Sequence, residues 1–215
     1  MSLSGRSSLF GRKVRKATRC FAVTPYYLNV LPWHFLAQIS ENMNKTKQIL
    51  VATNFGNAIQ EVASKLPSGT YALAGGLAVG HWIQDRKTDD LDFALVAQDV
   101  SHIKKLFPHR IGEGDRIYHA KIKGVSVDSL KPAGYRWNRE AIQHAKKQLV
   151  EGVLLPVVTP EYLILYKMHA ERDKDHEDII KLLKLPDVYR VARLVVGRYL
   201  SLQHVEDLDQ WASVI

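Results

Sequence analysis

The chain has 215 residues and a mass of 24.4 kDa, which suits one domain or one domain with a helical appendage. Its composition, 46% hydrophobic and 24% charged, is typical of a globular protein and excludes a disordered or fibrous chain. A net charge of +8 invites comparison with nucleic-acid-binding proteins, but residues 1–40 hold six basic side chains and no acidic one, so residues 41–215 carry only +2. The body of the protein therefore gives no evidence of a nucleic-acid footprint.

Residues 1–43 form an N-terminal extension in the predicted organisation of the chain. A basic, serine-rich start is followed by an uncharged run over residues 20–40, an order that is typical of a targeting peptide. Pro25 and Pro32 interrupt this run, so it does not offer a membrane-spanning helix. We favour a dispensable extension over a targeting segment or a structural arm, because Met43 stands as an alternative start immediately before the first periodic helix.

The only cysteine, Cys20, excludes a disulfide framework and a thiolate zinc cluster. A single free thiol suits a reducing compartment. We therefore expect a cytoplasmic protein without a membrane partner.

Residues 44–159 are predicted to fold as an α/β core. Some segments repeat apolar residues at helical spacing, whereas short apolar or alternating runs bounded by glycine or proline indicate strands. We expect helices over residues 46–66, 77–83, 101–107 and 138–149, and strands over 71–74, 91–97, 116–123, 125–130 and 153–158. The two strands on either side of Lys123-Gly124 are expected to pair as a hairpin.

Residues 160–215 are helical in pattern throughout. We expect helices over residues 161–171, 174–184, 188–200 and 205–211. Strands in the middle of the chain and helices at both ends predict an α/β (α+β) fold, in which helices flank a mixed β-sheet and a C-terminal helical region packs on the core.

The segment that begins at Asp90 places two carboxylates on one face of a predicted strand. Alternate side chains of a strand share a face, so Asp90 and Asp92 point one way while Leu91 and Phe93 point the other. Two carboxylates whose Cα atoms lie roughly 7 Å apart repel each other, which favours a cation between them. The alternative is a pair of aspartates on the solvated side of an edge strand.

Two glycines, Gly75 and Gly76, follow the preceding strand and open a predicted helix. Backbone N–H groups at such a turn can approach an anion closely, and the N-terminus of a helix favours phosphate. A tight turn that merely needs glycine is the alternative explanation.

Asp128 supplies a third carboxylate from the alternating strand over residues 125–130. If this strand neighbours the strand of Asp90, three carboxylates can converge on two divalent cations. The alternative is a surface aspartate near the end of a strand.

These segments together resemble the nucleotidyltransferase superfamily, whose signature is a pair of small residues after a strand, a spacer, Asp-x-Asp, and a later carboxylate on an adjacent strand. The residues at those positions are Gly75, Gly76, Asp90, Asp92 and Asp128. Downstream segments at 155–163 and 167–179 are similar to small bacterial proteins of the AbiEii type, which include toxins of toxin–antitoxin pairs. Lincosamide and aminoglycoside nucleotidyltransferases share the Gly-Gly to Asp-x-Asp segment.

The resemblance implies a nucleotidyltransferase-like fold and transfer of a nucleoside monophosphate from an NTP to an acceptor hydroxyl or phosphate. It makes Asp90, Asp92 and Asp128 the metal-binding and catalytic carboxylates for Mg²⁺ or Mn²⁺, with Asp128 also taking the acceptor proton. Gly75 and Gly76 would hold phosphate oxygens through their backbone N–H groups.

Several charged residues complete the expected site. Lys167 lies in a segment so apolar that its ammonium group must reach solvent or an anion, and the resemblance implies that it contacts the triphosphate. The resemblance also places Lys174 and Asp175 in the site, with Asp175 orienting basic groups or the nucleotide. Arg86 and Lys87 precede the aspartates and add positive charge for the nucleotide or acceptor, unless they belong to a solvated loop.

The acceptor stays open, because RNA, a protein and a small molecule all carry suitable groups. The likeness to toxins makes an antitoxin protein a candidate partner. Two other functions fit the same motifs: a catalytically inactive nucleotidyltransferase-fold binding module, and an enzyme that modifies an antibiotic.

Overall fold

The computed structural model describes residues 54–84, 86–96, 110–113, 117–132 and 134–215, together with the helical residues 38, 40, 41 and 43. By its contacts the chain divides into two units, Met1–Lys45 and Thr46–Ile215. The second unit contains every candidate site residue. The helix expected over residues 101–107 lies outside the described residues.

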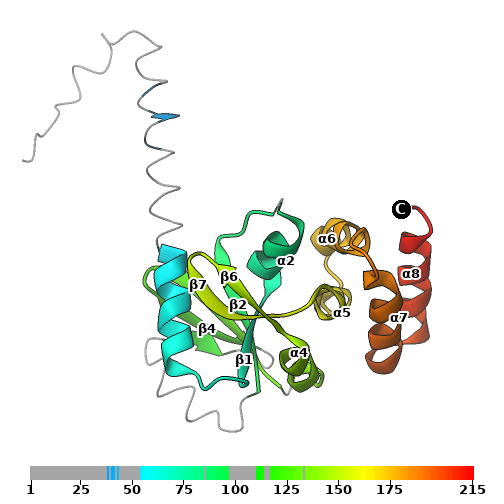
Figure 1. Cartoon of the computed structure of the whole chain (residues 1–215), viewed down its shortest axis with the longest axis horizontal. Helices are drawn as coiled ribbons and strands as arrows, with labels where there is room; N and C mark the ends of the chain where they lie inside the picture. The colour runs from blue at the N-terminus through cyan, green and yellow to red at the C-terminus, as the bar shows by residue number, and fades with distance from the viewer. Residues whose placement is uncertain are drawn as a thin grey trace, which may run out of the picture. The chain divides into compact units, whose positions relative to one another are not determined.

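A mixed sheet forms the centre of this unit (Figure 1). Its seven strands follow the order β3-β4-β5-β2-β1-β7-β6. The strands are β1 (Tyr71–Ala74), β2 (Asp90–Leu95), β3 (Arg110–Glu113), β4 (Ile117–Ile122), β5 (Val125–Leu130), β6 (Lys146–Val150) and β7 (Val153–Val157). Two neighbouring pairs, β2 with β5 and β1 with β7, are parallel, and the other four are antiparallel. The carboxylate-bearing strands β2 and β5 are therefore direct neighbours near the middle of the sheet.

Helices cover the sheet and extend beyond it. They are a helix over residues 54–65, α2 (Gly75–Ile83), α4 (Asn138–His144), α5 (Pro160–Ala170), α6 (Asp173–Leu183), α7 (Val188–Tyr199) and α8 (Leu202–Ala212). Nearly every residue of α5 is buried, because the helix contacts α2 and α6 and also packs on α7 (Figure 1). No helix in the described part of the chain is long and apolar enough to cross a membrane.

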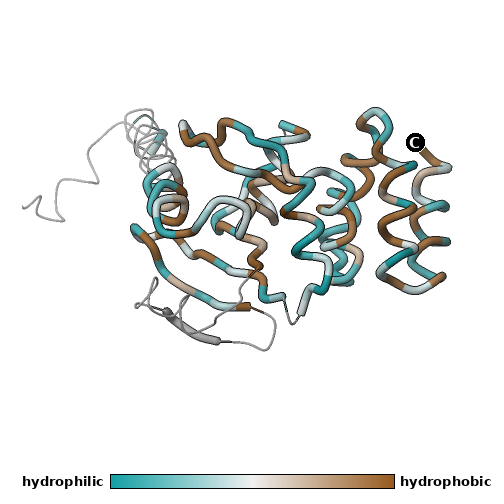
Figure 2. The backbone as a smooth tube through the Cα atoms, turned by 60° about the horizontal axis from the view of Figure 1, so that its bottom comes forward, coloured by the Kyte–Doolittle hydropathy of each residue, from teal (hydrophilic) through white to brown (hydrophobic). Residues whose placement is uncertain are grey.

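The core lies between the sheet and these helices. Leu73, Leu91 and Phe93 from the central strands are fully buried, as is Ile164 of α5. Hydrophobic and hydrophilic residues alternate along α7 and α8, so each helix has one face for packing and one for solvent (Figure 2). This arrangement confirms the predicted fold class, a mixed sheet flanked by helices with a helical C-terminal region.

Most predicted elements are found within two or three residues of their expected ends, but the helix expected over residues 138–149 is wrong in its second half. It ends at His144, and residues 146–150 form β6. Glu151 and Gly152 have positive φ angles of 49° and 79°, which suits the tight turn of a β-hairpin, and β6 pairs with β7 along its whole length. Pairing between strands therefore overrides the local helical pattern, and the short strand β3 was also missed.

Candidate active site

The site begins on β2, where the predicted alternation of side chains is present. Leu91 and Phe93 are fully buried in the core, whereas Asp90 and Asp92 keep part of their surface exposed on the other face. β2 is a central strand rather than an edge strand, because β1 and β5 pair with it on either side. Both carboxylates therefore belong to the interior of the sheet surface and not to its solvated margin.

One transverse row of residues crosses five strands at Asp92. In the register of the sheet Asp92 lies opposite Ala74 of β1 on one side and opposite Asp128 of β5 on the other. The row continues from Asp128 to His119 of β4 and then to Gly112 of β3. Residues opposite each other on neighbouring strands share a face, and their strands lie roughly 4.8 Å apart. The sheet thus brings two carboxylates and a histidine side by side, with small residues at both ends of the row.

The Gly75-Gly76 turn packs directly against this row. Gly75 has a φ of +61°, and a Cβ atom added to it would lie 1.7 Å from Oδ2 of Asp92. A Cβ on Gly76 would lie 2.8 Å from Oγ1 of Thr88, whose hydroxyl donates to the Asp90 carboxylate. Both glycines are therefore required sterically, because a larger residue would displace Asp92 in the first case and the hydroxyl that holds Asp90 in the second.

The Asp92 carboxyl group is electrostatically crowded. Burial raises its pKa, and the negative charges of Asp90 and Asp128 raise it further, to about 7. A hydrogen bond from the backbone of Gly76 and the positive charge of Arg172 act in the opposite direction without cancelling the rise. Asp90 and Asp128 are thus close enough to repel Asp92, which is the condition that a bound cation relieves.

His119 was not among the predicted site residues. Its Nδ1 atom lies 2.7 Å from Oδ1 of Asp128, and both side chains are partly exposed. The predicted hairpin contained the necessary signal, because a turn at Lys123-Gly124 sets residue 119 opposite residue 128.

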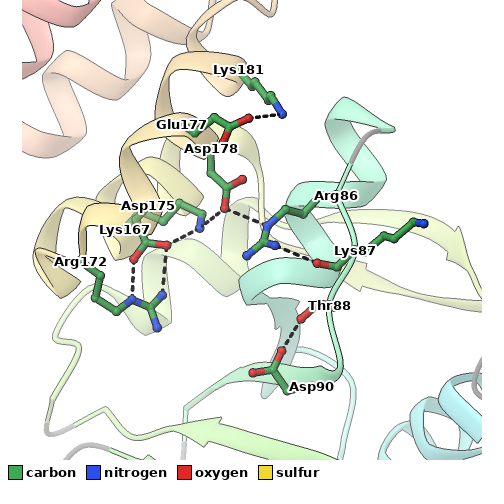
Figure 3. Close-up of polar contacts among 10 residues, drawn as sticks. All are labelled: Arg86, Lys87, Thr88, Asp90, Lys167, Arg172, Asp175, Glu177, Asp178 and Lys181. Carbon is green, nitrogen blue, oxygen red and sulfur yellow. Dashed lines mark hydrogen bonds and ion pairs between the residues drawn. The ribbon is translucent and has the colours of Figure 1, made fainter.

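A buried ion-pair network links α5 to α6 (Figure 3). The Nζ atom of Lys167 on α5 donates to Oδ1 of Asp175 at 2.7 Å and to Oδ2 of Asp178 at 2.6 Å, both on α6. These three side chains are almost completely buried, so the ammonium group meets two anions from its own chain instead of solvent. Direct contact of Lys167 with a triphosphate stays a prediction.

Two arginines extend this network by hydrogen bonds to its carboxylates. Arg172 donates from Nε to Asp175 at 2.6 Å, and Arg86 donates from Nε to Asp178 at 3.1 Å (Figure 3). Burial raises the pKa of Asp175, but the hydrogen bonds from Arg172 and Lys167 outweigh it and hold that pKa below its usual range. Asp175 is therefore an ionised anchor behind the cavity wall.

The turn, the aspartates and five basic side chains enclose a cavity of about 670 Å³. The basic side chains, which form the basic wall of the cavity, are Arg86, Lys87, Lys167, Arg172 and Lys174. Of the predicted site residues it is lined by Gly75, Gly76, Arg86, Lys87, Asp90, Asp92, Asp128, Lys167 and Lys174. Asp175 does not line it and lies behind Lys167 and Arg172. Residues that the sequence did not indicate also line the cavity, among them Thr88, His119, Ser126, Tyr135, Leu163 and Tyr166.

The donor atoms beside Asp92 suit a hard divalent cation. Carboxylate oxygens are the ligands that Mg²⁺ and Mn²⁺ prefer, and the crowding that raises the Asp92 pKa marks a place where positive charge is stabilised. Within the described ranges, however, no three His, Cys, Asp or Glu side chains are already drawn together as a metal site. Because the carboxylates repel one another, we expect them to converge only around a cation.

No family model matches the chain, and no curated protein matches its sequence. Among the solved structures that are similar to it, three share 16–18% sequence identity with it. An antigenic nucleotidyltransferase-like protein from Paracoccidioides brasiliensis is 16% identical with a TM-score of 0.38, over 66% of this chain and 84% of that one. The antibiotic-resistance factor ANT(2'')-Ia is 18% identical in its solution structure, with a TM-score of 0.39 over 79% of this chain and 95% of that one.

The crystal structure of ANT(2'')-Ia in complex with adenylyl-2''-tobramycin is 16% identical, with a TM-score of 0.42 over 75% of this chain and 97% of that one. At these scores the likenesses assign no function to the chain. A functional assignment must therefore rest on the cavity itself.

Proposed function

We propose that the chain is a metal-dependent nucleotidyltransferase, which transfers a nucleoside monophosphate from an NTP to an acceptor hydroxyl or phosphate. The observation that carries this proposal is the register of Asp92 beside Asp128 across β2 and β5, directly against the Gly75-Gly76 turn. Asp90 and five basic side chains line the same cavity. Paired carboxylates for cations, with basic groups for phosphate, suit phosphoryl chemistry.

Asp90, Asp92 and Asp128 are the residues that would hold Mg²⁺ or Mn²⁺. A divalent cation bound there supplies charge stabilisation for the triphosphate and lowers the pKa of the acceptor hydroxyl. The oxygen-only donor set of these three side chains fits such a cation.

The chain's own residues supply binding and orientation. The turn at Gly75 and Gly76 opens α2, so its backbone N–H groups favour the negative charge of a phosphate. Arg172 and Lys174 line the opposite wall and would neutralise the departing pyrophosphate. Lys167 and Asp175 hold Arg172 in place, and Asp128 would accept the acceptor proton.

The reaction balances with these groups. The acceptor oxygen forms a bond to the α-phosphorus, and the bond from that phosphorus to the bridging oxygen breaks. Pyrophosphate leaves with that electron pair, while the acceptor proton passes to the carboxylate and then to solvent.

Label transfer tests the proposal directly. We would incubate the chain and Mg²⁺ with each α-labelled NTP, supplying RNA, cell protein and small-molecule acceptors in separate reactions. Transfer is expected for wild type and for the control Asp207→Ala on α8, and at least about 100-fold less for Asp90→Ala and Asp92→Ala. Equal transfer by the Asp92→Ala variant would refute the assignment.

The same experiment separates the alternatives. Binding of NTP with Mg²⁺ but no transfer to any acceptor would identify a binding module, and transfer only to an antibiotic hydroxyl would identify a drug-modifying enzyme. The role of a toxin held by an antitoxin protein stays a prediction, which co-expression with the product of a neighbouring gene would test.

A further inference from the structure

Each carboxylate of the proposed cation site has a separate neighbour that holds it. The Thr88 hydroxyl donates to Asp90, and the Gly75-Gly76 turn packs on Asp92 and donates to it from the backbone. Asp128 has His119 as its side-chain partner, with Nδ1 of His119 2.7 Å from Oδ1 of Asp128. The first support lies just before β2 and the second opens α2, whereas the third comes from the β4–β5 hairpin.

The hydrogen bond fixes which atoms of His119 and Asp128 meet. A carboxylate only accepts hydrogen bonds, so Nδ1 of His119 carries the proton and donates it to Oδ1 of Asp128. The other carboxylate oxygen, Oδ2, is then left for a ligand. Since rotation about the last bond of an aspartate is soft, one such hydrogen bond decides which oxygen faces the cavity.

Asp128 needs this support because its neighbour repels it. Asp92 lies directly opposite on the adjacent strand, and like charges at that spacing drive the two carboxylates apart. About a quarter of the Asp128 side chain is exposed, so solvent offers it an alternative orientation. His119 lies on the far side of Asp128 in the same transverse row, so its hydrogen bond holds the repelled carboxylate over the sheet and keeps it from turning to solvent.

We propose that His119 is a positioning residue for the cation site: it holds Asp128 by the Nδ1–Oδ1 hydrogen bond so that Oδ2 faces the cation that Asp92 binds. The inference rests on the proposed function for the identity of the ligand, a divalent cation with its triphosphate. It adds a residue from β4 to a site otherwise built from β2, β5 and the turn before α2.

Two amide substitutions test the hydrogen bond without a large change in shape. The amide nitrogen of asparagine lies about as far from Cβ as Nδ1 of histidine, whereas that of glutamine corresponds to Nε2. We therefore expect His119→Asn to keep the support and His119→Gln to lose it. His119→Phe removes the donor altogether, and His144→Phe, on an exposed histidine of α4 outside the cavity, is the matched control.

The readout is Mn²⁺ affinity, measured by calorimetry on the full chain without nucleotide. Loss of a side chain that supports a metal ligand typically costs about 10- to 100-fold in affinity, which is the loss expected for His119→Phe and His119→Gln. His119→Asn and His144→Phe are expected to bind as wild type does. In label transfer, the kcat of His119→Phe should recover as Mn²⁺ is raised, because the defect lies in holding the cation.

The outcomes separate this inference from the proposed function. If wild type transfers label but the His119→Phe variant binds Mn²⁺ as tightly as wild type, the inference is wrong and the function stands. If Mn²⁺ affinity follows the expected order but no acceptor is labelled, the function fails and the inference stands. Equal affinities for His119→Asn and His119→Gln, or no Mn²⁺ binding by wild type, would also overturn it. The Asn–Gln comparison still decides the question if His119→Phe does not fold.

Discussion

Asp92 is expected to be both essential for transfer and unfavourable for the folded state. Its pKa is raised to about 7 by burial and by the charges of Asp90 and Asp128, so the ionised form is destabilised in the native protein. Asp92→Asn removes that charge and keeps a side chain of the same shape, with an oxygen for the Gly76 backbone and an amide that can donate to the neighbouring carboxylates. We therefore expect the variant to lose activity and gain stability.

The size of the gain follows from the pKa. A rise from the ordinary value of 3.8 to about 7 is roughly three pH units, which corresponds to about 4 kcal/mol of free energy of unfolding when Asp92 is fully ionised. The side chain keeps some exposure to solvent, so this figure is a ceiling, and a gain on the order of 2 kcal/mol is expected for Asp92→Asn at pH 8.

The gain should depend on pH with a definite sign. Between the unfolded and folded pKa values the native state binds more protons at Asp92 than the unfolded chain does, so this residue lowers stability as the pH rises through that range. The difference in free energy of unfolding between Asp92→Asn and wild type should therefore grow from about pH 4 to about pH 8 and then level off. Urea unfolding at a series of pH values, without divalent cations, measures it.

Two comparisons make this prediction specific. Asp209 forms an exposed ion pair with Arg193 that lowers the pKa of its carboxyl group, so Asp209→Asn should give no gain at any pH. Saturating Mg²⁺ should stabilise wild type more than Asp92→Asn, because the cation compensates the charge that the variant lacks. A variant that is no more stable than wild type at pH 8 would show that Asp92 is not electrostatically crowded.

Two further substitutions probe the turn and the basic wall. Gly75→Ala should abolish label transfer, because the added Cβ would lie 1.7 Å from Oδ2 of Asp92. In urea unfolding, the same clash should lower the free energy of unfolding by several kcal/mol. The control Gly124→Ala, also at positive φ but in open space, should lower it by only about 1 kcal/mol and keep activity. Lys167→Met should lower the free energy of unfolding by about 3–5 kcal/mol, because two buried carboxylates lose the cation that they share. The control Lys184→Met, at an exposed lysine, should change the free energy of unfolding little. A cost for Lys167→Met as small as that for Lys184→Met would contradict the network.

The sequence predicted those parts of the fold and site that depend on local pattern. A short apolar run bounded by glycine identified β1, and an apolar run after a polar loop identified β2. Alternation along β2 placed its aspartates on the face opposite its core residues. The second half of the helix expected over residues 138–149 failed because pairing with β7, which the local pattern does not show, decided its conformation. Tyr135 and Tyr166 were missed for a similar reason, since only tertiary packing brings them to the cavity.

His119 differs from these, because the sequence held enough information to find it. The turn at Lys123-Gly124 pairs residues that are equally distant from it, which sets His119 opposite Asp128. The parallel pairing of β2 with β5 was not available in the same way, because no turn joins those strands. Register within a hairpin can thus be read from a turn, while register between strands distant in sequence requires the structure.

The charges around the cavity lead to a last prediction about nucleotide binding. Five basic and four acidic side chains line the cavity, and Asp175 and Asp178 lie behind the wall as partners of Lys167, Arg172 and Arg86. Together these eleven side chains carry a formal net charge of −1, so the cavity as a whole does not attract a triphosphate. We therefore expect NTP to bind at least about tenfold more weakly when divalent cations are chelated, a difference of 1.4 kcal/mol or more. Titration of a fluorescent NTP analogue in Mg²⁺ and in EDTA measures this, and equal affinities would mean that the basic wall binds the triphosphate without help from the carboxylates.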